Sequence, residues 1–113
     1  MADPIFLKEN EKHALKALRE RLEALYGSRL RQMVLYGSKA RGESTDESDI
    51  DVLVVVENLE NPRQACRRII SESSPIDLEH NVFLSVHAVD AEYFEKAISM
   101  PFYANVRNEG IPL

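Results

Sequence analysis

Four leucines recur along the first part of the chain at steps of three and four residues: Leu15, Leu18, Leu22 and Leu25. This spacing puts them on one side of an α-helix, with the charged residues between them on its other sides. Gly27 follows the stripe at a position that suits the end of a helix. The pattern predicts a helix over residues 8–26 whose leucines pack into the core.

Three shorter apolar runs predict strands over residues 31–36, 50–56 and 82–89. The second run, IDVLVVV, is rich in β-branched residues and is apolar after its first two positions, which indicates a strand buried on both faces. Small and polar residues fill positions 37–49, so this segment is expected to be mostly turn and loop.

A helix is expected to connect the second and third strands. Asn61-Pro62 is suited to begin it as N-cap and first residue, and Pro75 is expected to end or kink it. Residues 76–80 fit no single element. Because a helix that crosses between two strands of one sheet makes them parallel, strands two and three are expected to be parallel neighbours.

A helix is expected near the C-terminus, and Asp90 is suited to cap it. One or two last helical turns are expected to start at Pro101 and to stop at Gly110. The order helix, strand, strand, helix, strand, helix predicts an α/β (α+β) protein built on a small mixed β-sheet. The length favours a single domain over residues 1–113.

Charge bears on the kind of partner. The chain has 14 Lys and Arg against 19 Asp and Glu, a formal net charge of −5. The basic residues are interleaved with acids, which is typical of solvated helix faces, so stable nucleic-acid binding is disfavoured. No apolar run is long enough to span a bilayer, and no secretory signal is recognisable. The interpretation is a cytoplasmic protein without a membrane partner.

Two acids stand at the head of the second predicted strand. Asp49 and Asp51 are separated by one residue, so in a strand their side chains point to the same face, about 7 Å apart. Carboxylates placed this way repel each other unless a positive group lies between them. A hard cation such as Mg²⁺ prefers carboxylate and phosphate oxygens, so the pair indicates a metal site. A solvated strand entry is the alternative.

A glycine and a serine follow directly at the end of the first predicted strand. Gly37 allows a sharp turn and the close approach of a phosphate. The Ser38 hydroxyl and neighbouring backbone N–H groups are suited to hold phosphate oxygens. Lys39 and Arg41 add positive charge beside them. Taken alone, an ordinary turn explains the same residues.

The two features stand at a fixed spacing, with ten residues between Gly37-Ser38 and Asp49-Ile50-Asp51. This combination arises by chance in on the order of one chain in a thousand. In the segments GSKARG and SDIDVLVVV the sequence resembles the minimal nucleotidyltransferases of the DNA polymerase beta superfamily. The resemblance extends less specifically over nearly the whole chain, including the ending PFYANVRNEGIPL.

This resemblance implies a polymerase-beta-like fold, in which helices pack on one side of a mixed sheet. It also implies transfer of a nucleoside monophosphate from a triphosphate, expected to be ATP, to an acceptor hydroxyl. The implied site comprises Gly37, Ser38, Lys39 and Arg41 for the nucleotide, and Asp49 and Asp51 for catalysis and for Mg²⁺.

The sequence departs from the superfamily pattern at the third carboxylate, which usually stands on a neighbouring strand. The third predicted strand contains no acid, and Ser85 and His87 occupy its polar positions. Asp77 and Glu79 lie just upstream, where parallel pairing brings the chain close to Asp51. Asp77 is therefore the candidate for the third catalytic residue. Without a substitute, nucleotide binding with slow or no transfer is expected.

Three functions are compatible with these features. Ranked first is transfer of AMP to a tyrosine of a HEPN-domain toxin, a small helical ribonuclease, because minimal nucleotidyltransferases are often the antitoxins of such proteins. The second is modification of a small molecule, in the manner of aminoglycoside nucleotidyltransferases, for which this short chain would need a homo-oligomer. The third is a non-catalytic antitoxin that acts by contact alone, which the missing third acid favours.

Overall fold

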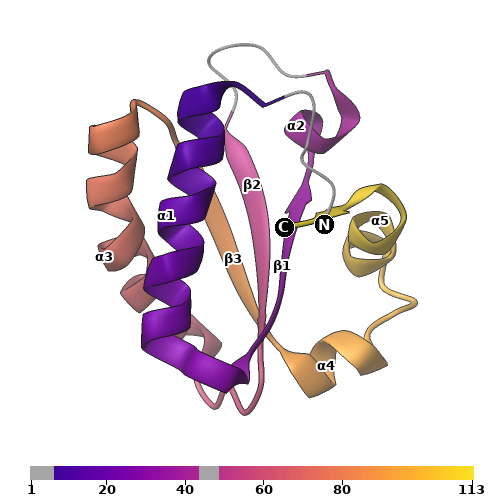
Figure 1. The fold of residues 1–113 in the computed structure, drawn as a ribbon. Coiled ribbons are helices and arrows are strands. Elements are labelled where there is room, and N and C mark those ends of the chain that lie inside the picture. The colour runs from indigo at the N-terminus through magenta and orange to yellow at the C-terminus, as the bar shows by residue number, and fades with distance from the viewer. Residues whose placement is uncertain (1–6, 44–48) are drawn as a thin grey trace.

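The computed structural model describes residues 7–43 and 49–113. Its strands and helices, shown in Figure 1, are α1 (Glu9–Tyr26), β1 (Leu30–Tyr36), α2 (Ser38–Arg41), β2 (Ile50–Val56), α3 (Pro62–His80), β3 (Leu84–Asp90), α4 (Ala91–Lys96), α5 (Pro101–Glu109) and β4 (Ile111–Pro112). A short 3₁₀ turn, Gly27–Arg29, joins α1 to β1. The predicted first helix and the first two strands are confirmed to within one residue at each end.

The sheet has the strand order β3-β2-β1-β4. β1 runs antiparallel to both β2 and β4, whereas β2 and β3 are parallel because α3 crosses between them. The predictions of a mixed sheet and of parallel second and third strands are confirmed. β4 was not predicted, because its two residues carry no strand pattern and become a strand only by pairing with Val34 and Leu35.

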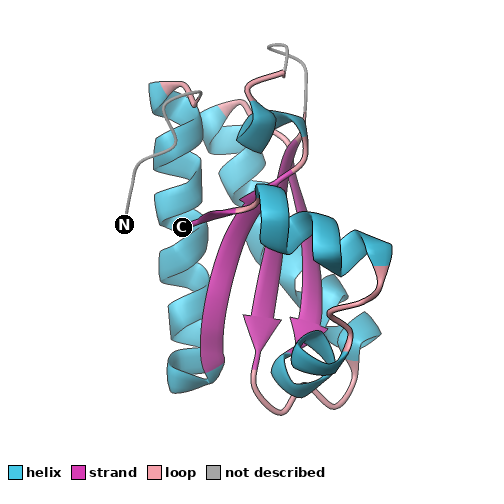
Figure 2. Ribbon diagram, turned by 90° about the vertical axis from the view of Figure 1, so that its right-hand side faces the viewer, coloured by secondary structure: helices cyan, strands magenta, loops and turns pink. Residues whose placement is uncertain are grey.

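Alternate residues of β2 point to two separate apolar clusters. Val52 and Val54 face α1 and α3, whereas Leu53 and Val55 face α4 and α5. Figures 1 and 2 show the two long helices on one side of the sheet and α5 lying across its other side. We call this second side the α4/α5 face. The expected packing of helices on one side therefore describes α1 and α3, while the two short helices cover part of the opposite face.

Of the two expected effects of Pro75, an end or a kink, the end is wrong, because α3 continues through this proline to His80. Ile69 and Ile76, one on each side of it, are 0% and 4% exposed in the core under α3. Proline has no backbone N–H, so the carbonyl of Ser71 has no helical hydrogen-bond donor at position 75. Both residues are exposed to water. Packing on the buried side therefore keeps the helix continuous, and solvent satisfies the lost hydrogen bond.

Asp90 caps α4 as predicted, since its carboxylate accepts hydrogen bonds from the N–H groups of Glu92 and Tyr93 at 3.1 and 3.2 Å. α5 runs from Pro101 to Glu109, also as predicted. These helices fix where the chain returns across the α4/α5 face towards β4. None of the helices in the described part of the chain is long and apolar enough to cross a membrane.

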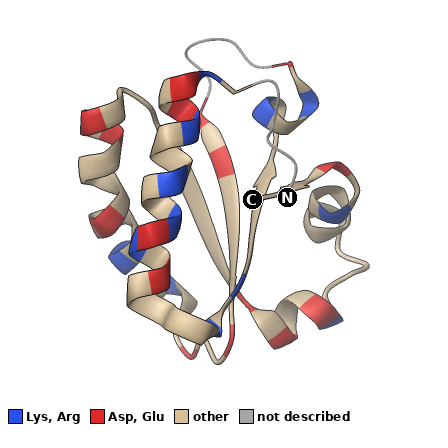
Figure 3. Cartoon of the chain, viewed as in Figure 1, with Lys and Arg blue, Asp and Glu red and all other residues tan. Residues whose placement is uncertain are grey.

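Acidic and basic residues are intermixed along α1, as its red and blue segments in Figure 3 show. Several of them pair within one helix, for example Arg19 with Glu23 at 3.4 Å and Lys12 with Glu9 at 3.7 Å. The lysines and arginines of α1 are thus partly neutralised by their own neighbours and do not gather into a continuous basic face.

Candidate active site

The glycine after β1 lies directly against the second acid of β2. Tyr36 is paired with Asp51 in the antiparallel ladder, so the next residue, Gly37, turns beside that carboxylate. Gly37 has φ 74° and ψ −155°, and a Cβ placed on it would overlap the Asp51 carboxylate oxygen. Both the left-handed backbone and the close approach therefore require glycine at this position.

Ser38 begins a helical turn rather than a loop. The Gly37 carbonyl accepts hydrogen bonds from the N–H groups of Ala40 and Arg41 at 3.1 and 3.2 Å, which forms α2 from Ser38 to Arg41. The expectation of turn and loop over residues 37–49 is corrected for these four residues. Residues 44–48 of that segment lie outside the described residues. The start of α2 and the two acids thus meet at one end of the sheet.

The acids of this end differ in their surroundings. Asp51 is partly buried, whereas Asp49 is exposed. Burial raises the pKa of the Asp51 carboxyl, the negative charge of Asp49 raises it further, and the Arg41 guanidinium opposes both effects. A partly buried carboxylate beside a second one is electrostatically unfavourable, and a bound cation would relieve it.

The residue of β3 that lies beside Asp51 is a serine. In the parallel ladder Asp51 is paired with Ser85, so the two side chains point to the same face of the sheet from neighbouring strands. Ser85 is exposed and uncharged. The residue of β3 paired with Asp51 is therefore not an acid.

Asp77 lies in the last turn of α3, where its carboxylate accepts a hydrogen bond from the Leu84 N–H at 3.0 Å. Burial raises the pKa of the Asp77 carboxyl, the charge of Asp49 adds to this, and the Leu84 hydrogen bond opposes it. Asp77 is thus close enough for Asp49 to influence its charge. Nevertheless, within residues 7–43 and 49–113 no three acidic, histidine or cysteine side chains converge as a metal-binding group.

Lys39 points into the protein. Its ammonium lies 2.6 Å from a Glu11 carboxylate oxygen, and the side chains are only 2% and 6% exposed. The other Glu11 oxygen accepts a hydrogen bond from the Lys8 N–H at 2.8 Å. In this structure Lys39 therefore ties α2 to the start of α1 and does not present its charge beside Ser38, where the sequence analysis expected it.

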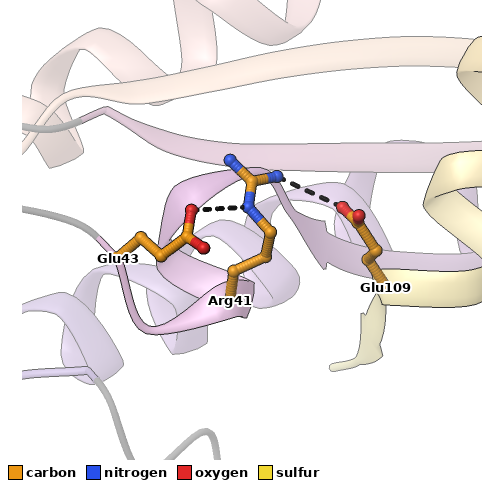
Figure 4. Close-up of polar contacts among 3 residues, drawn as sticks. All are labelled: Arg41, Glu43 and Glu109. Carbon is orange, nitrogen blue, oxygen red and sulfur yellow. Dashed lines mark hydrogen bonds and ion pairs between the residues drawn. The ribbon is translucent and has the colours of Figure 1, made fainter.

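Arg41 stands at the end of α2 between two acids (Figure 4). Its guanidinium donates hydrogen bonds to Glu43 at 3.0 Å and to Glu109 of α5 at 3.2 Å. It remains exposed and near enough to Asp51 to lower the pKa of that carboxyl. Arg41 thus brings positive charge to the acidic end of the sheet while it links α2 to the C-terminal helix.

Sequence reasoning missed Glu11 and Glu109, which hold the two basic residues of α2. For Glu11 a signal was present, because it stands four residues before Leu15 on the apolar stripe of the first helix. An acid on such a stripe indicates a buried cationic partner. Nothing in the sequence marks Glu109, since its pairing depends on how α5 returns across the sheet.

A hollow of about 610 Å³ lies at the opposite end of the sheet, beyond the end of β2. Several charged groups that line it pair with neighbours, as Arg31 lies 2.7 Å from Glu57 and Arg107 stacks 4.0 Å above the ring of Phe94. It is therefore separate from the acids at the head of β2, and the chemistry of that end does not involve it.

The residues at the head of β2 suit a divalent cation with phosphate ligands. Asp49, just before the strand, and Asp51, within it, offer hard oxygen donors, which Mg²⁺ prefers. Gly37 leaves the space beside the Asp51 carboxylate that any larger residue would fill. This close backbone approach next to two acids is compatible with a phosphate group and a cation.

The model of the nucleotidyltransferase domain family matches residues 15–100, which include Gly37, Ser38 and the acids Asp49, Asp51 and Asp77. The chain therefore belongs to this family, and it is a minimal nucleotidyltransferase of the DNA polymerase beta superfamily.

Two proteins of Methanocaldococcus jannaschii, each named "Putative protein adenylyltransferase", are similar to the chain along most of its length. The first is 32% identical over 102 residues, covering 89% of this chain and 95% of that protein. The second is 27% identical over 97 residues, covering 86% and 92%. A crystal structure of a putative nucleotidyltransferase from Sulfolobus solfataricus matches with a TM-score of 0.47 and 19% identity, over 94% of this chain and 86% of that one.

Replacing Gly37 by alanine is expected to abolish measurable binding of ATP with Mg²⁺, because the new methyl group displaces the Asp51 carboxylate. The left-handed backbone adds a loss of stability of about 1–3 kcal/mol. Gly27→Ala is the matched control, since Gly27 also has positive φ, +56°, but has no atom within 4 Å of an added Cβ. Calorimetry and thermal unfolding of both variants check this, and normal ATP affinity in Gly37→Ala would contradict it.

Proposed function

We propose that this chain is an Mg²⁺-dependent adenylyltransferase that moves AMP from ATP to a tyrosine of a HEPN-domain toxin in the cytoplasm, and thereby acts as its antitoxin. The observation that carries the proposal is the contact of Gly37 with the Asp51 carboxylate. It brings together the turn that we propose to bind phosphate and the acid that we propose to bind metal. The names of the two archaeal relatives support a protein as the acceptor.

Each residue of the site has a part in the proposed reaction. The acceptor oxygen forms a bond to the α-phosphorus of ATP, and the bond from this phosphorus to the pyrophosphate oxygen breaks. Gly37 and Ser38 hold the phosphates that leave. Mg²⁺, when bound by Asp49 and Asp51, neutralises the negative charge on the transferring and leaving groups.

Asp77 is the proposed acceptor of the hydroxyl proton. Its carboxylate is oriented by the Leu84 N–H, and a raised pKa brings a carboxylate closer to the basicity that proton transfer at neutral pH requires. Lys39 has a positioning part, because its ion pair with Glu11 fixes α2 and hence the Gly37-Ser38 turn.

An acceptor on another molecule fits the exposure of the site. Asp49, Ser85 and His87 are all exposed, so a tyrosine can approach the carboxylates from solvent. The acceptor side chain would then come from the partner protein, which orients its own hydroxyl.

The test uses the purified chain, ATP, MgCl₂ and a HEPN-domain partner, with the intact mass of the partner as the readout. A mass increase of one AMP on a partner tyrosine, absent with the Asp49→Asn/Asp51→Asn variant, is the expected result. A partner that is neutralised without any gain in mass would contradict the proposed transfer.

One observation favours a second function, neutralisation by contact alone. On β3, the strand next to Asp51, the residue paired with Asp51 is Ser85 and not an acid, and without a third carboxylate the transfer step loses a group that activates the acceptor. Under this alternative the Asp49→Asn/Asp51→Asn variant still neutralises the toxin, because no chemistry is needed.

Asp77→Asn is expected to lower the rate of AMP transfer by about a hundredfold. The amide oxygen of asparagine still accepts the Leu84 hydrogen bond, so stability and ATP affinity should change little while the charge is lost. Glu79→Gln, which alters an exposed acid two residues away, is the control. Equal transfer rates for both variants would assign Asp77 a purely structural role as a cap for β3.

A further inference from the structure

An exposed aromatic side chain lies across the α4/α5 face next to the acids. Phe102, in the first turn of α5, makes edge-to-face ring contacts with Tyr36, His87 and Tyr103 at centroid distances of 5.5, 5.6 and 5.0 Å. Figure 2 shows the helix that carries it crossing in front of the strands. In spite of these contacts Phe102 keeps 41% of its surface exposed.

The strand register places this ring beside Asp51. Tyr36 is paired with Asp51 on β1, and His87 is paired with Leu53 on β3. Asp51 and Leu53 point to the same face, one pleat or about 7 Å apart. Because Phe102 contacts both Tyr36 and His87, it spans β2 over this stretch and lies on the same face as the Asp51 carboxylate.

The geometry of group transfer limits where the nucleoside of a bound nucleotide can lie. On the proposed function, the leaving pyrophosphate lies at the Gly37-Ser38 turn, at the β1 side of Asp51. Displacement at phosphorus is roughly in line, so the acceptor enters from the opposite, β3 side, where Ser85 is exposed. The nucleoside is then directed along β2. The nucleoside can extend past Asp49, beyond the end of the sheet, or in the opposite direction towards Phe102.

We propose that Phe102, held by Tyr36 and His87, is the surface on which the nucleobase stacks, an inference that rests on the proposed function. Aromatic rings stack on every nucleobase through their π faces. The edge-to-face neighbours fix the orientation of the Phe102 ring, so little side-chain entropy is lost when a base binds. His87 supports the ring from β3, and partial desolvation of its imidazole lowers its pKa.

The test compares ATP with inorganic tripolyphosphate, both with MgCl₂. Tripolyphosphate carries the phosphates without the base. Phe102→Ala is expected to weaken ATP binding by about tenfold and to leave tripolyphosphate binding unchanged. Leu78→Ala is the control, since Leu78 is an exposed apolar residue on α3, at 87% exposure, and should change neither affinity.

A second variant keeps an aromatic ring at position 102 and reports binding by fluorescence. The chain contains no tryptophan, so Phe102→Trp introduces a single indole at the proposed stacking position. Its fluorescence is expected to change on addition of ATP but not of tripolyphosphate, with ATP affinity kept or increased.

The outcomes separate the stacking surface from the site as a whole. Unchanged ATP affinity in Phe102→Ala, or an indole that does not respond to ATP, overturns the inference while the proposed function stands. Equal losses of ATP and tripolyphosphate affinity also overturn it, because the substitution then acts through the phosphate site. If the unmodified chain binds neither ligand, the proposed function fails, and the stacking surface fails with it.

Discussion

Replacing Asp51 by asparagine is expected to lower AMP transfer by about a thousandfold, since a bound metal contributes several kcal/mol of charge stabilisation to such reactions. Asparagine keeps the size of the side chain and its place beside Gly37 but removes the charge that holds Mg²⁺. The intact mass of the modified partner over time measures the rate. A rate within a few-fold of the unmodified chain would exclude Asp51 as a metal ligand.

The same substitution is expected to stabilise the protein in the absence of metal. The pKa of Asp51 is raised by burial and by Asp49. A carboxyl whose pKa is higher in the folded state stabilises the fold when protonated, and it costs stability once pH rises above that pKa. At neutral pH Asp51→Asn therefore unfolds at a higher temperature than the unmodified chain without Mg²⁺.

Thermal unfolding with and without Mg²⁺ and ATP resolves the two effects. The unmodified chain is expected to gain stability from the ligands, by mass action on the folded state, whereas Asp51→Asn should gain none. Glu20→Gln on the exposed side of α1 is a suitable control and should behave as the unmodified chain in both conditions. A variant less stable than the parent without metal would contradict the electrostatic account of Asp51.

Replacing Glu11 by glutamine is expected to destabilise the fold by about 3–5 kcal/mol, the usual cost of removing one partner of a buried ion pair. The Lys39 ammonium then stays almost fully buried without the carboxylate that lies 2.6 Å away. Because α2 is attached to α1 through this pair, the Gly37-Ser38 turn should also lose its fixed position. Urea unfolding measures the loss of stability, and calorimetry measures the accompanying fall in ATP affinity.

An exposed pair of similar length provides the comparison. Lys96 and Glu92 lie 2.7 Å apart, but their side chains are 75% and 73% exposed, so Glu92→Gln should leave stability unchanged. A double variant with Glu11→Leu and Lys39→Met should recover most of the stability, because an apolar pair of similar volume avoids the desolvation cost. Equal effects of Glu11→Gln and Glu92→Gln would contradict the buried-pair argument.

The predicted site residues differ in how far the local sequence fixes their positions. Gly37, Ser38, Asp49 and Asp51 lie at one end of the sheet because they stand where β1 ends and the adjacent β2 begins, and strand boundaries follow from local apolar patterns. The Lys39 side chain points into the protein, because it pairs with Glu11, a buried acid on α1. A long, flexible side chain pairs with a group that the fold brings near it, and the local sequence does not reveal that group.

The sequence by itself determined the order of the main helices and strands and the parallel pairing of β2 and β3, and it predicted the chemistry of the Gly37-to-Asp51 segment. These features depend on residue spacing within short segments and on one general rule of connection. The tertiary structure alone decided that Ser85 stands beside Asp51, that α3 continues through Pro75, and that Phe102 lies over the sheet beside the acids. Each of these depends on contacts between residues far apart in the chain, and packing free energy across the whole fold outweighs local preference there.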